Sequence, residues 1–327
     1  MPDQMRVLFI TLSNVGDAIL GLPALDLVRA AHPEARITVL AGPRSAAVFQ
    51  GRRDVHQTLI HERGASWREV VALWRYLRAQ RFETVIDLRQ TLWAVALGVR
   101  RRSPLLRQPP RQLVHRRERH LWRAARALGV AMREPVRDSF ALPSDEEAVA
   151  RWWREAGVPD EAPLVAVSPG ARSHIKRWTT EGFAAVADRL IAEERCHVVL
   201  TGEESERAVV EEVVGRMRER ACHVAVGQTT VPQLAVLLSR CRLLIANDSA
   251  TMHLGAYLGV PTVAIFGPTD PDKYGPRGPR HRVLQRQLHC VPCEASLCRF
   301  QHECMRELTA EDVCTAAREL LGLGVQR

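Results

Sequence analysis

The stretch Leu243–Pro271 constrains the fold of this chain more than any other part of its sequence. Leu243–Ala246 is a short apolar run typical of a buried strand, and polar residues 247–249 end it just before a helix-like segment. Gly259 ends that segment, and the apolar run Pro261–Phe266 follows. A strand, a turn, a helix and a second strand in this order predict one unit of a parallel sheet.

The turn at residues 247–249 is also a predicted ligand site. The first N–H groups of a helix lack partners within the helix, and together with the helix dipole they favour a phosphate or sugar hydroxyls. Gly267–Pro271 follows the next strand. Because ligands of open α/β sheets bind beyond the carboxyl ends of the strands, we expect both loops to face one crevice. Asp248 and Ser249 either contact the ligand or only cap the helix.

Length and composition describe an ordinary globular protein. The chain has 327 residues, which is enough for two domains of roughly 150 residues each. Its 46% hydrophobic and 25% charged residues are typical of a soluble protein, and Met1–Leu12 lacks the features of a secretory signal. Every apolar run is shorter than a membrane-spanning helix requires. We therefore expect a cytoplasmic protein.

The chain is strongly basic, with a formal net charge of +9 and a pI near 9.6. This surplus favours an anionic partner, which can be nucleic acid, a phosphorylated metabolite or an acidic membrane surface. Arginine supplies nearly all of the charge, since Lys176 and Lys273 are the only lysines. Arg100–Arg126 is densely basic, and it is either an anion-binding surface or a solvated helix face with basic loops.

Predicted strands and helices alternate along both halves of the chain, which indicates doubly wound α/β domains. The G-x-G-x-x-G fingerprint is absent after the first strand, which disfavours an NAD-dependent dehydrogenase. A junction rich in proline, Pro135–Pro163, separates the halves, so the expected domains are residues 1–157 and 158–327. The first half is expected to hold strands at Arg6–Leu12, Arg36–Ala41, His56–His61 and Glu83–Leu88, with one helix from the first turn to about Ala31. The second half is expected to add strands at Leu164–Ser168, Cys196–Thr201 and Cys222–Val226, and a last helix at Thr309–Leu323.

Charged side chains follow several of these strands. Asp17 lies in the first turn of the helix after the first strand. Lys176 lies a few residues after the loop Ser168–Arg172, where a flexible ammonium can reach a diphosphate oxygen. Glu206 follows another strand, where a carboxylate can accept hydrogen bonds from two ribose hydroxyls. Each residue also has a purely structural interpretation, as a helix-start acid or a surface lysine.

These motifs occur together in one order: SNVGDAILGLPAL, SPGARSHIKRW, TGEESE, DSATMH, FGPTDP and a late cysteine pattern. In that order they resemble the ADP-heptose:lipopolysaccharide heptosyltransferases, which are glycosyltransferases of family 9 and of the GT-B type. The resemblance covers nearly the whole chain. It implies two Rossmann-like doubly wound domains facing a central crevice, an N-terminal one for the acceptor and a C-terminal one for the nucleotide-sugar. It also implies inverting transfer of heptose from ADP-heptose to a lipopolysaccharide inner-core acceptor.

The resemblance implies a role for each matching residue. The catalytic aspartate of the family falls on Asp17, and its ribose-binding glutamate falls on Glu206. The lysine that binds the diphosphate falls on Lys176, and this lysine is also expected to be catalytic. The adenine-contacting segment falls on Gly227-Gln228-Thr229. Trp178 precedes Thr179, where many members have proline, and Thr179 can cap the following helix instead. The other implied donor-binding residues are Ser168, Gly170, Ala171, Thr229, Asp248, Ser249, Ala250 and His253.

No cofactor or metal is expected to be required. A departing nucleoside diphosphate gains negative charge, which Lys176 and the helix start can stabilise, and no D-x-D metal signature lies where the diphosphate is expected. A separate cluster of cysteines is either a metal site or a set of reduced structural thiols. Its members are Cys290, Cys293, Cys298 and Cys304.

The expected partners are the nucleotide-sugar and a lipopolysaccharide core or lipid A precursor. Such acceptors carry phosphates and lie in a membrane, so we expect Arg116, Arg117 and Arg119 to bind the acceptor. The enzyme is then expected to be peripheral at the inner face of the cytoplasmic membrane, with no nucleic-acid partner. Two alternatives stay open: a related glycosyltransferase with another sugar donor or glycan acceptor, and a basic protein that binds nucleic acid or an anionic surface.

Overall fold

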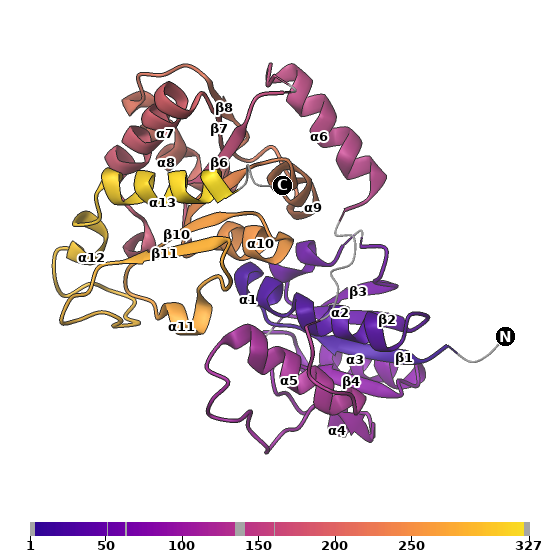
Figure 1. Cartoon of the computed structure of the whole chain (residues 1–327). Helices are drawn as coiled ribbons and strands as arrows, with labels where there is room; N and C mark the ends of the chain where they lie inside the picture. Colours follow the sequence, from indigo (N-terminus) through magenta and orange to yellow (C-terminus); the bar gives the residue numbers. More distant parts are fainter. Residues whose placement is uncertain (1–3, 51, 63, 135–140, 160, 324–327) are drawn as a thin grey trace. The chain divides into compact units, whose positions relative to one another are not determined.

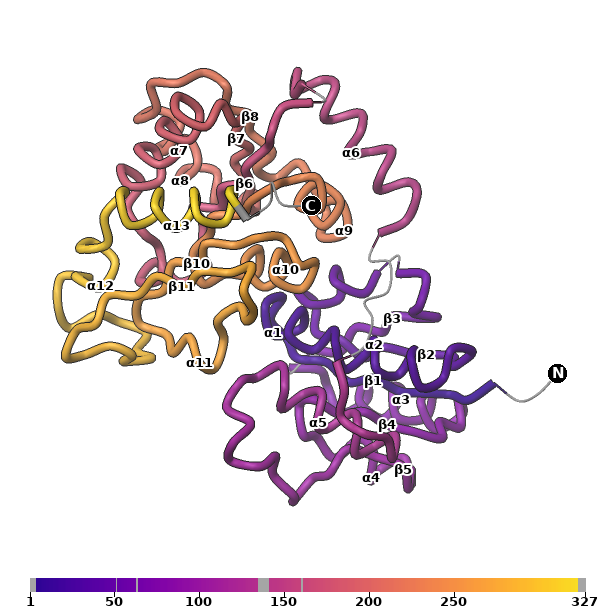
Figure 2. Tube along the Cα trace, in the orientation of Figure 1, coloured from indigo at the N-terminus to yellow at the C-terminus, as the bar shows by residue number. Residues whose placement is uncertain are grey.

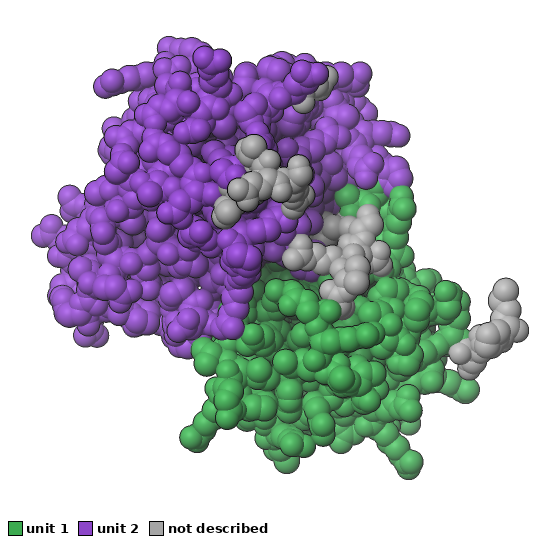
Figure 3. All heavy atoms as spheres, viewed as in Figure 1, with its two compact units in different colours: residues 1–142 green, residues 143–327 purple. Residues whose placement is uncertain are grey.

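The computed structural model describes residues 4–50, 52–62, 64–134, 141–159 and 161–323. The chain divides into two compact units, Met1–Leu142 and Pro143–Arg327 (Figure 3). Each unit is built on one parallel β-sheet with helices packed against it (Figure 1). Within the described residues, no helix is both long and apolar enough to cross a membrane.

The first unit has a five-stranded sheet with β1 (Arg6–Ile10) at its centre. β1 pairs in parallel with β2 on one side and with β4 on the other. Residues 7–10 of β1 are fully buried and all apolar, as is typical of a central strand in a parallel sheet. The order across the sheet is β3 (Gln57–Ile60), β2 (Arg36–Ala41), β1, β4 (Thr84–Asp87) and β5 (Arg101–Arg102).

The single helix predicted after β1 is in fact two helices, α1 (Val15–Leu20) and α2 (Leu22–Ala31). Gly21 lies between them. Pro23, at the second position of α2, has no N–H to donate, so it fits the first turn of a new helix but not the interior of a long one. The prediction of one continuous helix is therefore wrong at this point.

Helix α5 (Arg116–Leu128) positions the basic residues of the first unit. It packs against α2 and β4. It ends at Gly129, whose φ of 72° lies in the left-handed region that favours glycine. The other helices of this unit are η1 (Ser45–Val48), α3 (Trp67–Ala79) and α4 (Trp93–Ala96).

The second unit has a six-stranded parallel sheet, and its centre is the strand predicted at the start of the Leu243–Pro271 stretch. The predicted strand, turn, helix and strand are β9 (Leu243–Asn247), α10 (Ala250–Leu258) and β10 (Thr262–Phe266). Helix α10 ends at Gly259, as expected, with a φ of 76°. The order across the sheet is β11 (His281–Gln285), β10, β9, β6 (Leu164–Ser168), β7 (His197–Leu200) and β8 (Cys222–Val224).

The boundary between the units precedes α6 (Pro143–Glu155), whereas the sequence places it after residue 157. Helix α6 packs against α9 (Val231–Ser239) of the second unit. Trp153 on α6 is only 6% exposed, and burying a side chain of this size ties the helix to the unit in which it is buried. Pro135, at the start of the predicted junction, lies outside the described residues.

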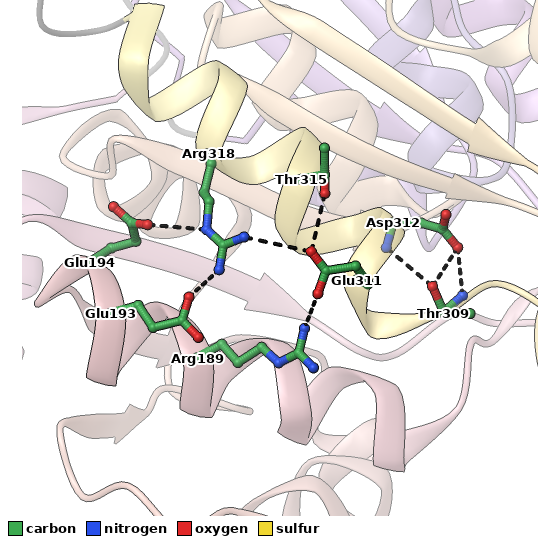
Figure 4. A network of polar contacts seen from close by, with 8 residues as sticks. All are labelled: Arg189, Glu193, Glu194, Thr309, Glu311, Asp312, Thr315 and Arg318. Carbon is green, nitrogen blue, oxygen red and sulfur yellow. Dashed lines mark hydrogen bonds and ion pairs between the residues drawn. The ribbon is translucent and has the colours of Figure 1, made fainter.

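The C-terminal helix α13 (Ala310–Leu323) is joined to α7 (Thr180–Glu194) by ion pairs (Figure 4). Arg318 of α13 pairs with two glutamates of α7, and Arg189 of α7 pairs with Glu311 of α13 at 2.5 Å. Between β11 and α12 the chain runs as a long loop, residues 286–302 (Figure 2). The remaining helices are η2 (His174–Lys176), η3 (Glu204–Glu206), α8 (Arg207–Arg216), α11 (Pro271–Tyr274) and α12 (Glu303–Arg306).

Candidate functional site

A cluster of polar side chains lies where β9 ends and α10 begins. The Asp248 carboxylate accepts hydrogen bonds from Lys176 Nζ at 2.7 Å and from Thr269 Oγ1 at 2.6 Å. His253 Nε2 lies 3.7 Å from the other oxygen of the same carboxylate. Lys176 follows β6, Thr269 follows β10, and Asp248 and His253 follow β9. The cluster therefore lies beyond the carboxyl ends of three neighbouring strands, where ligands of parallel α/β sheets bind.

The electrostatics of the cluster keep Asp248 ionised. Burial acts to raise the pKa of Asp248, but attraction to His253 and Lys176, with hydrogen bonds from Lys176 and Thr269, lowers it more, so the pKa lies below its usual value. The side chain of Lys176 is 30% exposed, and a lysine ammonium has three N–H donors, of which Asp248 takes one. Lys176 can thus be held by Asp248 and still donate to a phosphate oxygen.

The start of α10 adds a second group that favours negative charge. Ser249 caps the helix, since its Oγ accepts the N–H of Met252 at 3.5 Å. Asp248 is not the cap, because its carboxylate binds Lys176 and Thr269 instead. The first N–H groups of α10, from Ala250 onward, have no carbonyl four residues back within the helix. Ser249 therefore caps the helix, and Asp248 positions the lysine.

Asn247 lies in the turn that the sequence predicts as a ligand site, but the sequence analysis gives it no role of its own. It is fully buried, and its Nδ2 donates to the carbonyl of Pro169 at 2.8 Å. Its Oδ1 accepts the N–H of Trp178 at 3.0 Å. These bonds tie the segment that carries Lys176 to the end of β9. The sequence signal is one amide side chain at the end of an otherwise apolar run.

Glu206 packs on the loop that follows β6. A Cβ atom at Gly170 would lie 2.2 Å from Glu206 Cδ, so only glycine leaves room for this carboxylate. The backbone N–H of Glu203 donates to Glu206 Oε2 at 2.9 Å. Burial raises the pKa of Glu206 more than this hydrogen bond lowers it. Ser168 and Ala171 in the same loop are each 1% exposed, so their side chains support the loop from within.

The segment Gly227-Gln228-Thr229 forms the turn between β8 and α9. Gly227 has a φ of +69°, and a Cβ atom there would meet the Glu204 carboxylate at 2.0 Å, so this position requires glycine. Gln228 Oε1 accepts a hydrogen bond from the Trp152 indole N–H at 2.6 Å. Thr229 is half-buried in the same turn. Helix α6 thus supports this turn, which explains why α6 belongs to the second unit.

In the first unit, Asp17 lies at a cavity of about 380 Å³. Asn14 Nδ2 donates to Asp17 Oδ2 at 3.0 Å. The lining comes from residues 12–14 and 17 after β1, residues 88–90 after β4, and one face of α5. Asp17 therefore lies at the carboxyl ends of the central strands, beside the basic helix.

The structure separates the three arginines that the sequence assigns to the acceptor. Arg116 and Arg119 line the cavity together with Asp17. Arg117 is not among the lining residues and pairs with Glu134 instead. Two of the three thus share a cavity with the predicted catalytic aspartate.

His120 and Arg123 also line this cavity, and the sequence analysis does not identify them as site residues. His120 is 6% exposed, and its Nδ1 has no hydrogen-bond partner among the described residues. Burial, followed by the charges of Arg123, Arg116 and Arg119, lowers the pKa of His120 to about 3, so the ring is neutral at physiological pH. The sequence signal is the spacing of three and four residues within the basic run, which places these side chains on one helix face.

The four late cysteines are free thiols. Burial, followed by the neighbouring Cys298, Cys290 and Cys293, raises the pKa of Cys304 to about 11. Among the residues that the structure describes, no group of three or more His, Cys, Asp or Glu side chains is placed to hold a metal ion.

Comparison with known proteins identifies the family to which the chain is similar. The model of glycosyltransferase family 9 (heptosyltransferase) matches residues 102–303, which is more than half of the chain. Lipooligosaccharide heptosyltransferase 2 of Campylobacter jejuni is 31% identical over 163 residues, which are 48% of this chain and 51% of that protein. The chain thus spans about half the length of this curated relative. Lipopolysaccharide heptosyltransferase 3 of Escherichia coli is 26% identical over 282 residues, which are 78% of this chain and 81% of that protein.

The fold is similar to that of a solved heptosyltransferase. The structure of ADP-heptose LPS heptosyltransferase II of Escherichia coli matches with a TM-score of 0.77 at 23% identity, over 98% of this chain and 99% of that one. This similarity confirms the predicted GT-B architecture of two Rossmann-like domains. The family match includes Lys176, Glu206 and Asp248, whereas Asp17 lies outside it. The chain belongs to glycosyltransferase family 9, the heptosyltransferase family.

Proposed function

We propose that this chain is an inverting glycosyltransferase that moves heptose from ADP-heptose to a lipopolysaccharide inner-core acceptor. The observation that carries the proposal is the position of Lys176, which Asp248 holds at the start of α10. A transferase of this kind must stabilise the negative charge of a departing diphosphate. The names of related proteins, which include lipopolysaccharide heptosyltransferases and an ADP-heptose enzyme, support the choice of donor and acceptor.

The diphosphate is bound by Lys176 and by the N–H groups at the start of α10. Breaking the bond to the sugar leaves negative charge on the phosphate, and both groups interact more strongly with that charge than with the intact donor. Asp248 holds the ammonium in place before the donor arrives, so little reorganisation is needed. His253 lies beside Asp248 and completes the charged cluster. No cofactor is needed for this step.

The nucleoside is bound by two turns of the second unit. Glu206 accepts hydrogen bonds from the ribose hydroxyls, and its raised pKa reflects the burial that such a contact requires. Gly170 leaves the space in which the Glu206 carboxylate lies. The turn Gly227–Thr229 contacts the adenine, and Trp152 orients the Gln228 amide within it.

Asp17 is the general base. The acceptor hydroxyl must lose its proton as it attacks the anomeric carbon, and a carboxylate within hydrogen-bond reach can accept that proton. Asp17 lies at a cavity of the first unit and is held by Asn14. The first unit is then the acceptor-binding domain, and the second binds the nucleotide-sugar. A peripheral position at the inner face of the cytoplasmic membrane follows from an acceptor that is anchored in a membrane.

The test is a transfer assay with purified protein. Truncated lipopolysaccharide that lacks heptose is incubated with ADP-heptose, UDP-glucose or GDP-mannose, and the product is analysed by mass spectrometry. We expect the mass of one heptose to be added from ADP-heptose alone. Transfer from another donor would indicate a related glycosyltransferase with a different substrate. RNA binding with a steep salt dependence, in a protein that does not bind ADP, would refute the proposal in favour of a basic binding protein.

A further inference from the structure

Large apolar side chains are exposed mainly in the first unit. Among the described residues thirteen of them are exposed, and ten of these thirteen belong to the first unit. Trp67 at the start of α3 is 72% exposed, and Leu92 just before α4 is 71% exposed. Single exposed apolar residues are ordinary on a protein surface, but several on one face mark a binding surface.

One side of α3 carries a stripe of such residues. Trp67, Val71 and Trp74 are four and three residues apart, so they lie on the same side of the helix. Trp67 and Val71 are exposed and Trp74 is half-buried, whereas Leu77, on another side, is fully buried. The helix is thus held to the unit by one side and leaves its apolar stripe uncovered.

Helix α4 extends this stripe. The Trp74 indole N–H donates to the carbonyl of Ala96 at 2.9 Å and so joins the two helices, which are labelled in Figure 1. Trp93 packs against the core of the first unit, whereas Leu92 and Val95 are exposed. The two helices together form a surface, called here the α3–α4 face, whose apolar members are Trp67, Val71, Trp74, Leu92 and Val95.

Arginines border the α3–α4 face. The guanidinium carbon of Arg68 lies 5.5 Å from the centre of the Trp67 ring, and that of Arg78 lies 5.3 Å from the centre of the Trp74 ring. Arg75 is exposed between them on the same helix. Because a guanidinium is attracted to the face of an indole, each pair presents an apolar ring and a positive charge side by side.

The charge around this face is not balanced by acids. Residues 66–114, which include both helices, hold ten arginines and three acidic residues, a surplus of seven positive charges. Each of the three acids already has a partner in the first unit. Glu69 accepts the N–H of Ser66, Glu83 accepts the N–H of Arg6, and Asp87 accepts hydrogen bonds from the loop that follows it. The segment is therefore complementary to an anionic surface.

We propose that the α3–α4 face docks on an anionic lipid bilayer, with its apolar side chains inserted among the lipids and its three arginines bound to the head groups. Tryptophan is enriched at membrane interfaces because its ring is amphipathic. Arginines close to an anionic membrane surface add their contributions to binding. Leu92 and Val95 gain apolar contact in a bilayer, whereas the phosphate backbone of a nucleic acid offers them none.

The position of the face suits an acceptor that is anchored in a membrane, and in this respect the inference rests on the proposed function. Leu92 lies two residues after Gln90, which lines the cavity at Asp17. Two residues span at most about 7 Å. The Asp87 carboxylate accepts the N–H of Thr91 at 2.7 Å and so fixes the loop between them. Docking through this face therefore brings the acceptor sugar to the cavity while its lipid anchor stays in the bilayer.

The first test measures vesicle binding without any sugar substrate. The purified protein is sedimented at physiological salt with vesicles of phosphatidylcholine, alone or mixed with phosphatidylglycerol, and we expect binding to the mixed vesicles only. Leu92→Ser should weaken this binding about tenfold, and Arg75→Ala about fivefold. Leu297→Ser is the matched control, because Leu297 is 70% exposed but belongs to the second unit, and Arg220→Ala is the control for charge. Urea unfolding should give the same free energy for all four variants and the wild type, because these side chains are exposed.

The second test locates the contact and connects it to transfer. Lipids brominated on their acyl chains quench a tryptophan that enters the bilayer, and Trp67→Phe should lose much of this quenching while it keeps most of the vesicle binding. In the transfer assay, Leu92→Ser should raise the KM for an acceptor in vesicles about tenfold. The same variant should leave kcat, and the KM for an acceptor dispersed in detergent, unchanged.

The outcomes separate the docking surface from the proposed function. Equal binding to neutral and anionic vesicles, or equal effects of Leu92→Ser and Leu297→Ser, would overturn the surface even if heptose transfer is observed. Vesicle binding that Leu92→Ser weakens, in a protein that transfers no sugar, would retain the surface and refute the proposed function. A dimer that Leu92→Ser dissociates, in a protein that binds no vesicles, would show an interface between two copies of the chain and overturn the membrane surface.

Discussion

The charged cluster at the start of α10 and the arginine-lined cavity at Asp17 differ in how their positive charge is balanced. In the cluster, Lys176 is held by the buried carboxylate of Asp248, which Thr269 also binds. In the cavity, four arginines surround one aspartate. The first arrangement is compensated before any ligand arrives and keeps a fixed geometry. The second brings like charges together, and burial followed by repulsion from Arg119 lowers the pKa of Arg123.

This difference has consequences for function. A departing diphosphate needs charge in a fixed position, because stabilisation of the transition state depends on groups that do not reorganise. Capture of an anionic acceptor depends more on the total field, which steers the ligand and weakens with salt. We therefore expect substitutions in the cluster to change nucleotide affinity, and substitutions in the cavity to change acceptor kinetics.

The largest expected effect is that of Asp17→Asn, which should lower kcat and leave the affinity for ADP unchanged. Asp17→Asn removes the base without changing the size of the side chain, so kcat should fall about 100- to 10,000-fold. The dissociation constant for ADP should stay within about twofold of wild type, because Asp17 and the nucleotide-binding residues lie in different units. Rapid-quench transfer assays and calorimetry measure the two quantities. Weakened ADP binding with near-normal turnover would contradict the assignment.

The sequence predicts the cluster better than the cavity, and the reason is physical. The strand, turn and helix at Leu243–Pro271 are encoded locally, by apolar runs and by Gly259, whose left-handed φ is observed. Asn247 and Thr269 lie in loops that the sequence predicts, but their hydrogen bonds are not predicted because these join segments far apart in the chain. Strand β11 is missed because it is polar and only half-buried at the sheet edge.

The cavity was predicted only in part because it depends on which face of a helix is buried. The composition of Arg100–Arg126 shows a basic segment, but it does not show that α5 packs against α2 and β4. That packing directs Arg116 and Arg119 to the cavity and leaves Arg117 with Glu134. Neighbouring arginines therefore differ in their surroundings although their sequence context is nearly the same.

A second prediction tests the charged cluster at the start of α10. Lys176→Ala should weaken binding of ADP about 10- to 100-fold, because a charge-assisted hydrogen bond to phosphate is lost, and should leave adenosine binding unchanged. Lys176→Arg should restore only part of the affinity, since the guanidinium is longer and planar. Lys273→Ala is the matched control, because that lysine pairs with Glu294 at 2.8 Å. Calorimetry measures these affinities, and an equal loss of affinity for adenosine and for ADP would place Lys176 away from the phosphates.

A third prediction concerns the space next to Glu206. Gly170→Ala would place a Cβ atom 2.2 Å from Glu206 Cδ, so the carboxylate must move and lose the hydrogen bonds that we propose it makes to the ribose. We expect ADP binding to weaken about tenfold and binding of 2′,3′-dideoxy-ADP to change much less. Gly215→Ala on α8 is the control, because a Cβ atom there meets nothing within 4 Å. If the variant loses affinity equally for both nucleotides, Glu206 does not bind the ribose.

The smallest expected effect compares the pH dependence of two carboxylates in the second unit. Burial raises the pKa of Glu206 in the folded protein, so its ionised form is destabilising. This cost is absent below the unfolded-state pKa of about 4.3, grows as the pH rises toward the folded-state value, and is fully present above it. Asp248 behaves in the opposite way: its lowered pKa provides stability above its unfolded-state pKa of about 3.9, and this stability is lost as the pH falls through the folded-state pKa.

Glu206→Gln should therefore raise the free energy of unfolding at pH 7 by no more than about 1 kcal/mol and leave it unchanged near pH 4. The same variant should bind ADP more weakly, because the amide accepts fewer hydrogen bonds from the ribose than a carboxylate does. Urea unfolding at the two pH values measures the first effect, and calorimetry measures the second. A stabilised protein with weaker ADP binding would show that Glu206 is kept ionised for its ligand at a cost to the fold. Destabilisation at pH 7 would mean instead that the carboxylate has a structural role, and the ribose contact would have to be sought elsewhere in the second unit.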